Sequence, residues 1–483
     1  MKQIYDVLII GAGVVGSAVA REMARYKLKI GVLEKNHDVC FETSGRNSGV
    51  IHGGFAYEIG TLKAECCVEG NLEFDQVAKE LDVPFKRTGK VLVGNTDADY
   101  KSLQNTIAIG KINGSVGLEI LDKEHLHELV PTVIGEFAMF SPTSGIVEPF
   151  HYTIALAENA KMNGVDFYLN HEVVGIHREE DGTYTITTTQ GNFSTRWVVN
   201  CAGLGCVKIS DMLGIPGYHI GGTKGNYIIL DKKLGPLLPM PVYPVPSSTY
   251  MGIHVTPTIE GNVIIGPDAD RVDSFTDYSV AQENMDFLAE SASTLWPQIH
   301  KSDYIRNYCG IQPTWLDGNG VIKDFIIEAR EEAPHTINLV CIESPGLTSA
   351  LPIARRAVRL LSERETLQPN KNFNPNRKGM VRFSEQSDEE KVRLIAENPD
   401  YGEVICRCET VTKAEIMQAV HNLLGVDTIV GIKYRTRSMM GRCQGGYCQM
   451  RVAEIIQEEL GKKVTDVLYA RTGSNMFTGK VRE

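Results

Sequence analysis

The first 34 residues have the pattern of a strand, a glycine-rich turn, a helix and a second strand, and no other part of the sequence constrains the fold as strongly. An apolar run precedes Gly11, Gly13 and Gly16, and a second apolar run ends at Glu34. Gly11 permits a tight turn, Gly13 lets the backbone approach a pyrophosphate, and Gly16 allows close helix–strand packing. The helix N-terminus attracts phosphates, and Glu34 can accept hydrogen bonds from a ribose. The unit therefore predicts a dinucleotide-binding domain; a tight turn without a ligand is the competing interpretation.

The composition is that of an ordinary globular protein. Of the 483 residues, 42% are hydrophobic and 23% are charged, which excludes collagen-like, coiled-coil and disordered classes. A net charge of -11 disfavours nucleic acid and anionic membrane surfaces as partners, so an anionic ligand needs local cations. No apolar run reaches the ~18 residues that span a bilayer. Without a recognisable secretory signal, we expect a cytoplasmic protein that contacts a membrane at most peripherally, through a partner.

Residues 43–54, TSGRNSGVIHGG, are rich in small residues and contain a single imidazole, that of His52. Such a segment buries little apolar surface, but its backbone N–H groups can lie against an extended ligand. With GTLKAECC at 60–67, it resembles the flavin-binding segment of the D-amino-acid-oxidase-like FAD-dependent oxidoreductases. Within that superfamily it is most similar to anaerobic-type glycerol-3-phosphate dehydrogenases and L-2-hydroxyglutarate dehydrogenases. The resemblance extends over roughly residues 1–365.

The resemblance implies FAD as a cofactor and assigns residues to it. Val173 is expected near the adenine, Ala202 and Gly203 at a second turn onto the cofactor, and the start of a late helix beside the flavin ring. The full set of expected FAD contacts is Gly11, Gly13, Gly16, Glu34, Thr43, Ser44, Arg46, Asn47, Ser48, Val173, Ala202, Gly203, Gly346, Leu347 and Thr348.

Alternating apolar runs divided by turn residues predict an antiparallel sheet over 214–328. This sheet and a segment of about residues 80–150 are expected to form the substrate subdomain of an FAD-binding oxidoreductase domain over 1–367. The Pro- and Asn-rich segment 368–402 is expected to be a linker, followed by a further domain and tail over 403–483. We therefore predict an α/β fold: a Rossmann-type FAD-binding domain with an inserted antiparallel-sheet substrate domain, plus a small α-rich C-terminal domain.

The cysteines predict the chemistry of the C-terminal domain. Four of the eleven, Cys406, Cys408, Cys443 and Cys448, lie in the last fifth of the chain in CxC and Cx4C spacings. Four thiolates on two short loops suit a soft metal centre, and structural zinc is the competing interpretation. The arrangement CRCE…GRCQGGYC resembles the bacterioferritin-associated-ferredoxin-like [2Fe–2S] domain. The resemblance implies that residues 403–483 are a [2Fe–2S]-binding domain and tail, with these four residues as cluster ligands. The other seven cysteines are expected to be buried thiols.

The sequence between and beyond these cysteines predicts further elements. We expect a helix within 412–425, a short strand over 428–434, and another helix after Cys448. The basic residues nearby either offset the charge of the thiolates or form a docking face for an electron acceptor. These residues are Lys433, Arg435, Arg437 and Arg442.

A flavin next to an iron–sulfur cluster implies a substrate that donates hydride, because a flavin takes two electrons together and a cluster passes them singly. Oxidation of an alcohol also requires a base for the hydroxyl proton, and histidine suits neutral pH. The resemblance places His52 beside the flavin ring, so His52 is the candidate catalytic base. A histidine that only satisfies a loop carbonyl is the alternative.

Recognition of the substrate departs from the family pattern. The resembling families carry an arginine in the strand that roofs the substrate, where this sequence has Gln312. Glutamine donates hydrogen bonds but lacks the charge that binds phosphate or carboxylate bidentately. Lys224, Arg306 and Arg46 could compensate, and we take Lys224, Gln312 and Arg306 as the candidate substrate-binding residues.

The sequence thus predicts a FAD-dependent dehydrogenase of a small hydroxylated anion, with sn-glycerol 3-phosphate, oxidised to dihydroxyacetone phosphate, as the leading substrate. L-2-hydroxyglutarate or another 2-hydroxy acid is the main alternative, and amine oxidation is a third. An electron-transfer subunit of a larger redox complex is an alternative of a different class. Electrons are expected to leave through the cluster to a redox partner protein, such as an NADH-linked flavoprotein subunit, and the chain is expected to be part of an oligomer.

Overall fold

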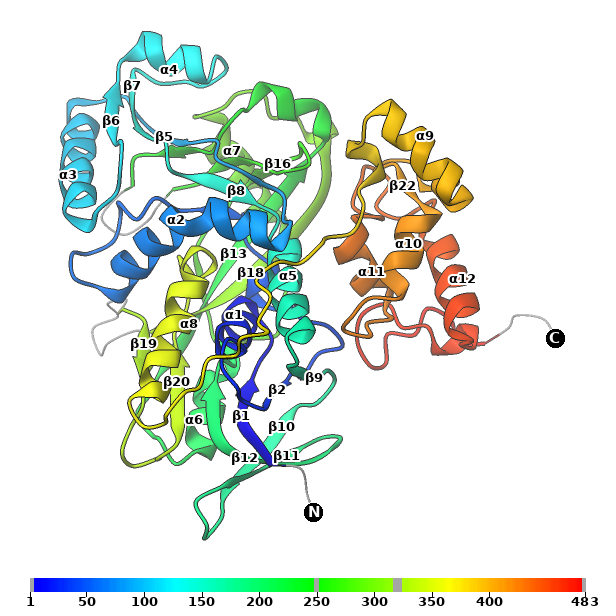
Figure 1. The fold of residues 1–483 in the computed structure, drawn as a ribbon. Helices are drawn as coiled ribbons and strands as arrows, with labels where there is room; N and C mark the ends of the chain where they lie inside the picture. The colour runs from blue at the N-terminus through cyan, green and yellow to red at the C-terminus, as the bar shows by residue number, and fades with distance from the viewer. Residues whose placement is uncertain (1–3, 247–251, 316–323, 480–483) are drawn as a thin grey trace.

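The computed structural model describes residues 4–246, 252–315 and 324–479 (Figure 1). Its first sheet contains the predicted dinucleotide-binding unit, in which α1 (Val14–Met23) connects the parallel strands β1 and β2. The strand order is β10–β11–β12–β1–β2–β9; β20 pairs with β12, and β19 pairs with β20. The bounds are β1 Ile4–Ile10, β2 Ile30–Leu33, β9 Asp166–Tyr168, β10 Val173–Arg178, β11 Tyr184–Thr188, β12 Gly191–Asn200, β19 Ile326–Glu328 and β20 Thr336–Val340.

Strand β1 is buried on both sides, which explains its nearly continuous apolar sequence. Val7 and Ile9 join the core formed with α1, α5 (Pro149–Met162) and α8 (Gly346–Ser362). Leu8 points to the opposite side, into a core formed with β10, β11 and α6 (Cys206–Met212). Alternate residues of one strand therefore hold both covering layers on the sheet.

The second sheet has the order β17–β13–β16–β15–β14–β5–β7–β6, with β18 paired to β13. Its longest pairing is antiparallel, between β13 (Ile220–Leu230) and β18 (Tyr304–Trp315). Strands from both predicted ranges meet in this sheet. The other bounds are β5 Lys90–Gly94, β6 Glu119–Leu121, β7 Phe137–Ser141, β14 Val242–Pro244, β15 Val255–Pro257, β16 Val263–Ile265 and β17 Asp270–Val272. The helices packed around it and the first domain include α2 Leu62–Leu81, α3 Asp97–Asn113, α4 Lys123–Leu129 and α7 Gln282–Ser293.

The segment expected to be a linker over 368–402 is folded in its second half. Helix α9 (Asp388–Glu397) begins at Ser387, whose hydroxyl accepts a hydrogen bond from the backbone N–H of Glu390. Asp388, Glu389 and Glu390 form the first turn of this helix, where negative charge is favourable. Leu394 of α9 packs with Phe383 and with Ala414 of the following domain.

The C-terminal domain is small and mostly helical, and it lies beside α5 (Figure 1). It contains β21 (Val404–Cys406), β22 (Val411–Thr412), α10 (Lys413–Val420), α11 (Ile429–Thr436) and α12 (Gln449–Leu460). The strand predicted over 428–434 is wrong, because this segment is α11. Thr428 caps the helix by accepting a hydrogen bond from the N–H of Gly431, and tertiary packing buries Ile429, Val430 and Ile432. Burial in a helix thus overrides the strand preference of β-branched residues.

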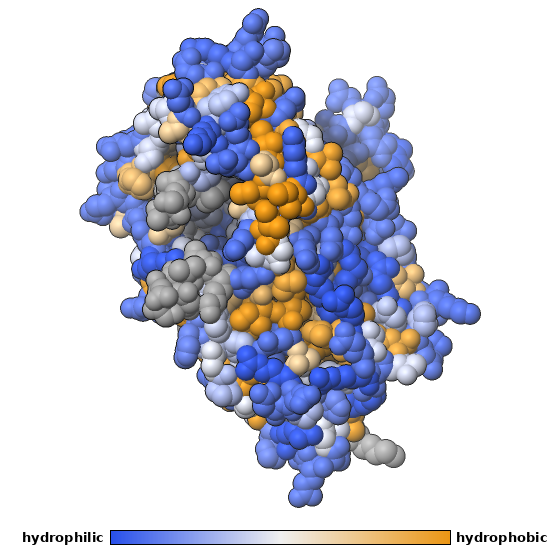
Figure 2. Space-filling model, turned by 90° about the vertical axis from the view of Figure 1, so that its left-hand side faces the viewer, coloured by the Kyte–Doolittle hydropathy of each residue, from blue (hydrophilic) through white to orange (hydrophobic). Residues whose placement is uncertain are grey.

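Figure 2 shows the face that carries α2 and α3, where apolar side chains gather among hydrophilic ones. The exposed large hydrophobic residues of the segment before α2 and of α3 and its following loop are Ile59, Tyr100, Ile109, Ile112 and Val116. Across the described ranges, no helix combines the length and the apolar character that a membrane crossing requires.

Candidate functional site

The glycine turn after β1 is packed against backbone atoms. Gly11 has a φ of 102°, in the left-handed region that favours glycine. A Cβ atom on Gly16 would lie 1.9 Å from the Gly11 carbonyl oxygen, and one on Gly13 would lie 2.9 Å from Ser44 Oγ. The three positions thus have the close approaches for which a dinucleotide-binding turn uses glycine.

Glu34 lies at the end of β2, and its carboxylate turns toward the glycine turn. One oxygen accepts a hydrogen bond from the Ala12 N–H (2.8 Å), and the other accepts one from the Asn36 N–H (2.9 Å). Burial raises the pKa of this carboxyl group. Because a carboxylate offers about four lone-pair sites, it can still accept a bond from a ribose hydroxyl.

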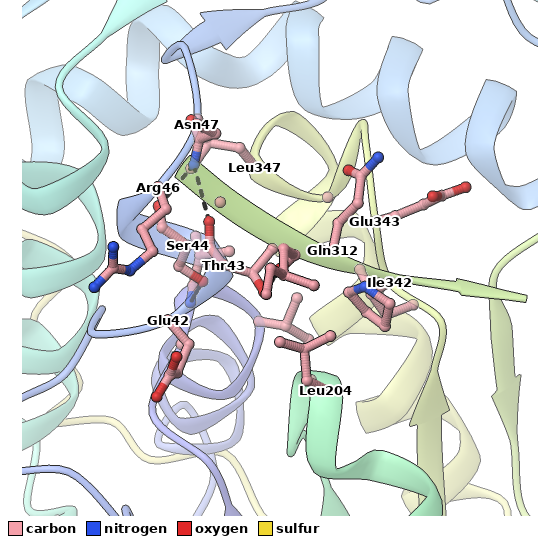
Figure 3. Close-up of a pocket in the computed structure, with 18 of the residues that line it drawn as sticks. Glu42, Thr43, Ser44, Arg46, Asn47, Leu204, Gln312, Ile342, Glu343 and Leu347 are labelled. Carbon is pink, nitrogen blue, oxygen red and sulfur yellow. Dashed lines mark hydrogen bonds between the residues drawn. The ribbon is translucent and has the colours of Figure 1, made fainter. Parts of the chain in front are cut away.

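A cavity of about 780 Å³ is lined by residues of both sheets and reaches Glu34 and His52. Figure 3 shows part of its lining, between Glu42 and Gln312. The expected FAD contacts that line it are Gly11, Gly13, Glu34, Thr43, Ser44, Arg46, Asn47, Ser48, Val173, Ala202, Gly203, Gly346 and Leu347. Gly16 and Thr348 are not among the lining residues. Gly16 instead packs the helix on the turn, and Thr348 holds the backbone of His52.

The segment 43–48 forms a wall of this cavity and is hydrogen-bonded to α1 and to the second sheet. The Val14 N–H, at the start of α1, donates to Ser44 Oγ (2.9 Å), and Thr43 Oγ1 donates to the carbonyl of Ile311 in β18 (2.7 Å). Asn47 Nδ2 donates to the Ser44 carbonyl (2.7 Å), which closes the segment on itself (Figure 3). A ligand in the cavity therefore meets a preformed wall.

His52 follows β3 (Val50–Ile51) and lines the other end of the cavity. Its backbone N–H donates to Thr348 Oγ1 (3.0 Å), and its carbonyl accepts from Asn71 Nδ2 (2.9 Å). Burial, and then the charges of Lys90 and His254, lower the pKa of His52 well below its usual value. The ring is neutral at neutral pH, which is the state required of a general base.

The residues around His52 include three that the sequence analysis missed as site residues: Lys90, Tyr243 and His254. The rings of Tyr243 and His254 stack with centroids 3.5 Å apart. Lys90 Nζ lies 4.3 Å from the Tyr243 ring centroid and 4.7 Å from that of Phe55. Lys90 is 2% exposed, no carboxylate of the described residues pairs with it, and burial lowers its pKa to about 7. The one feature of the sequence that could have indicated Lys90 is its position in the apolar run KVLVG, where a lysine is unusual.

The structure brings one of the three predicted substrate-binding residues to the cavity. Gln312 lies on β18, and its Oε1 accepts from the Ser344 N–H (3.4 Å). Lys224 is not a lining residue, because alternate residues of a strand face opposite sides; its Nζ pairs with Asp277 (3.3 Å). Arg306 donates to Gln444 of the C-terminal domain (3.1 Å), also away from the cavity.

Arg46 lines the cavity, but its guanidinium points away from Gln312 (Figure 3). The guanidinium lies 4.1 Å from the Tyr278 ring centroid and donates to the carbonyls of Phe41 and Cys309. These contacts suit a residue that holds the wall of the site. They do not place its charge beside Gln312.

The four predicted ligand cysteines meet in two pairs. Cys406 and Cys448 are buried and hydrogen-bonded to each other, and Cys408 and Cys443 form an exposed hydrogen-bonded pair. The hydrogen bond from Cys448, together with backbone N–H groups, lowers the pKa of Cys406 to about 6. The N–H groups of Tyr447 and Gly445 also donate to Cys443.

This arrangement suits a binuclear cluster. Within the described residues, no group of three or more His, Cys, Asp or Glu side chains is arranged around a single ion. Two pairs of thiols with inward N–H groups instead match a [2Fe–2S] cluster, which takes two cysteines at each iron. A Cβ atom on Gly441 would lie 2.3 Å from Cys408 Cβ, so the loop needs glycine there.

The basic residues near the cysteines mainly hold the two domains together. Arg435 makes two hydrogen bonds to the buried carboxylate of Asp38 (2.6 and 3.0 Å). Arg442 pairs with Asp231 (2.7 Å). Arg437 pairs with Glu148 (2.9 Å) and with carboxylates on both domains, Glu260 and Glu409. These three arginines therefore pair with carboxylates of the same chain, a role that neither of the two expectations included.

The cavity fits FAD on structural grounds. At the adenine end, the glycine turn and Glu34 are those of a dinucleotide site. At the other end, Gly346 and Leu347 at the N-terminus of α8 line the cavity. No side chain caps this helix, and the Gly346 N–H donates to the Glu343 carbonyl (2.6 Å). A helix N-terminus of this kind stabilises negative charge, such as that on the pyrimidine side of a reduced flavin.

Two protein families match separate parts of the chain. The family described as FAD dependent oxidoreductase matches residues 6–360, and the BFD-like [2Fe-2S] binding domain matches residues 404–458. The chain therefore has a FAD-binding domain and a [2Fe–2S]-binding domain, as the sequence predicted.

Individual relatives agree with this division. A glycerol 3-phosphate dehydrogenase of Caloramator mitchellensis is 39% identical over 482 residues, which cover 99% of each chain. An L-2-hydroxyglutarate dehydrogenase of Indibacter alkaliphilus is 30% identical and covers 72% of this chain and 96% of its own. Among solved structures, the L-alpha-glycerophosphate oxidase of Mycoplasma pneumoniae with FAD bound superposes with a TM-score of 0.73 at 28% identity, covering 78% of this chain and 98% of its own.

Proposed function

The chain belongs to the FAD-dependent oxidoreductase family, and we propose that within this family it is a dehydrogenase that oxidises sn-glycerol 3-phosphate to dihydroxyacetone phosphate. The observation that carries the proposal is the similarity over both domains to a glycerol 3-phosphate dehydrogenase. The L-2-hydroxyglutarate dehydrogenase relative, in contrast, covers 72% of this chain. The fold shared with glycerophosphate oxidase supports the same substrate class.

His52 is the proposed general base. When bound, FAD supplies the acceptor for the hydride of the substrate carbon, and a [2Fe–2S] cluster passes the two electrons on singly. A ring nitrogen of His52 takes the proton of the same carbinol group, so that the alcohol becomes a ketone. The lowered pKa of His52 keeps that nitrogen unprotonated, and the hydrogen bonds to Thr348 and Asn71 fix its backbone beside the cavity.

Electrons are proposed to leave from the exposed side of the cysteine cluster to a redox partner protein. Cys408 and Cys443 are exposed there, whereas Cys406 and Cys448 are buried. Tyr447, which is 46% exposed, lies between the ligand cysteines in sequence, and the Arg407 guanidinium lies 4.3 Å from its ring centroid. This pair gives a partner protein an aromatic and a cationic contact close to the cluster.

A substrate panel tests the reaction class and the substrate together. The purified holoprotein is mixed anaerobically with glycerol 3-phosphate, L-2-hydroxyglutarate, lactate or amino acids, and the flavin absorbance is followed. We expect rapid bleaching with glycerol 3-phosphate. Faster bleaching with L-2-hydroxyglutarate would identify that compound as the substrate instead, and His52 would remain the proposed base. No bleaching with any of these compounds would favour an electron-transfer subunit and contradict the proposal.

A further inference from the structure

The substrate end of the cavity needs a positive charge if it is to bind the proposed substrate. Glycerol 3-phosphate is an anion, yet Gln312 stands where the resembling families carry an arginine. Neither Lys224 nor Arg306 reaches the cavity. A cation that binds the phosphate must therefore come from another lining residue.

The lysines and arginines that line the cavity, as far as the structure describes it, are Lys35, Arg46, Lys208 and Arg271. Lys35 pairs with Glu42 (3.6 Å) and Lys208 with Glu172 (3.0 Å). Both lie at the adenine end, next to Glu34 and Val173 respectively. Arg46 is held by carbonyls and by the Tyr278 ring. Arg271 is thus the remaining basic residue with an uncommitted charge.

The pairing of three strands places Arg271 at the substrate end. Thr223 of β13 is the register partner of Arg271 in β17 and also of Gln312 in β18. Register partners share one face of a sheet, and neighbouring strands are about 4.8 Å apart. The Arg271 and Gln312 backbones are therefore about 10 Å apart on the same face, with Thr223 between them. A small anion between them is within reach of both side chains.

A chain of hydrogen bonds orients the guanidinium. Arg271 Nη1 donates to Thr223 Oγ1 (2.6 Å), which is 2.8 Å from Thr314 Oγ1. Thr314 donates its single proton to Glu343 (3.0 Å), so Thr223 must be the donor to Thr314. The Thr223 oxygen is then an acceptor for Arg271. Glu343, also bound by Lys63 (2.6 Å), lines the cavity just before α8.

Building on the proposed function, we infer that Arg271 binds the phosphate group of the substrate and takes the place of the arginine that is absent at position 312. Its guanidinium has five N–H donors and uses one of them on Thr223, while no described carboxylate pairs with it. The other donors can hold a phosphate bidentately. Gln312 adds a neutral hydrogen bond from the neighbouring position.

Kinetics of flavin reduction test this inference with Arg271→Gln. We expect the apparent Kd for glycerol 3-phosphate to rise about 10- to 100-fold, because a hydrogen bond to a charged group is lost. Reduction by glycerol, which lacks the phosphate, should be unchanged. The matched control is Lys301→Gln, which removes the same charge from an exposed residue outside the cavity. Arg271→Lys should lie between wild type and Arg271→Gln.

Two further measurements separate this inference from the substrate proposal and from misfolding. Adding Gln312→Arg to Arg271→Gln should restore part of the affinity, because it returns a guanidinium to the same sheet face. Inorganic phosphate, followed by its perturbation of the oxidised flavin spectrum, should bind to wild type and more weakly to Arg271→Gln. An unchanged Kd for both anions in Arg271→Gln would overturn the inference. A different outcome would overturn the proposed substrate but not the phosphate site. In that outcome, the wild-type protein binds phosphate and loses this binding in Arg271→Gln, but its flavin is not reduced by glycerol 3-phosphate.

Discussion

The catalytic proposal depends on the protonation state of one imidazole. His52 is the one histidine that the sequence analysis singled out, and it lines the end of the cavity that faces α8. Its environment could not be derived from the sequence, because Lys90, Tyr243 and His254 come from three different strands or loops. Only the fold brings a buried lysine and a stacked tyrosine–histidine pair beside that base.

Replacement of the base gives the first prediction. His52→Asn should retain FAD, because its backbone contacts to Thr348 and Asn71 remain, while the rate of flavin reduction falls about 10²- to 10⁴-fold. The measurement is anaerobic stopped-flow reduction at saturating glycerol 3-phosphate. His177→Asn, on the exposed surface of β10, is the control and should behave as wild type. Full turnover in His52→Asn would remove this residue from the base role.

The buried lysine gives a prediction about pH. A nearby cation disfavours the imidazolium form, so Lys90→Met should raise the pKa of His52. Because the base must be neutral, the acidic limb of the rate profile should move to higher pH. The substitution should affect the acidic limb because Lys90, whose pKa is about 7, carries its charge only below that pH. Lys90→Arg should keep the limb in place, and an unmoved limb in Lys90→Met would refute the coupling.

At the level of elements, the glycine turn was predictable and α11 was not. Gly16 has a local steric cause, the Gly11 carbonyl, and Gly11 has a positive φ, so a short sequence pattern records both. The segment over 428–434 has β-branched residues, and its helical state depends on burial against the rest of the domain. The helix within the expected linker could have been found from Ser387 and the acids after it, because an N-cap is a local signal.

The glycine turn also gives a prediction about stability. In Gly16→Ala the new Cβ atom would meet the Gly11 carbonyl at 1.9 Å, so α1 must shift away from the turn. We expect a loss of about 1–3 kcal/mol in the free energy of unfolding, together with weaker FAD binding. Gly205→Ala is the matched control, since its Cβ atom would meet only Ala202 Cβ at 3.7 Å. Equal thermal stability of the two variants would contradict this account of the turn.

For the whole molecule, the main finding is that the two domains are fixed to each other by buried charge. The sequence predicted both domains and both cofactors from separate motifs, but it contained no signal for how they meet. Asp38 follows β2 and Arg435 lies in α11, 397 residues away, and their ion pair is buried on both sides. The phenyl ring of Phe150 and the ring of Tyr434 stack at the same boundary, with centroids 4.1 Å apart.

This interface gives the prediction at the largest scale. Arg435→Met leaves the Asp38 carboxylate buried without its partner, which typically costs about 3–5 kcal/mol. The melting temperature should fall, and electron transfer between the flavin and the cluster should slow. Asp38→Asn combined with Arg435→Met removes the uncompensated charge and should recover much of the stability. A single variant as stable as wild type would show that the ion pair does not hold the domains.

We propose that this one chain takes electrons from a substrate at its FAD and passes them to its own [2Fe–2S] cluster. This transfer is tested by adding glycerol 3-phosphate anaerobically to the holoprotein and recording the flavin absorbance and the electron paramagnetic resonance spectrum of the same sample. Cys443→Ser serves as the control without an intact cluster, and dithionite shows the full cluster signal. We predict a bleached flavin and the signal of a reduced [2Fe–2S] cluster in wild type, and a bleached flavin alone in the variant. A protein that contains zinc in place of iron, or a flavin that bleaches while a dithionite-reducible cluster stays oxidised, would contradict the account.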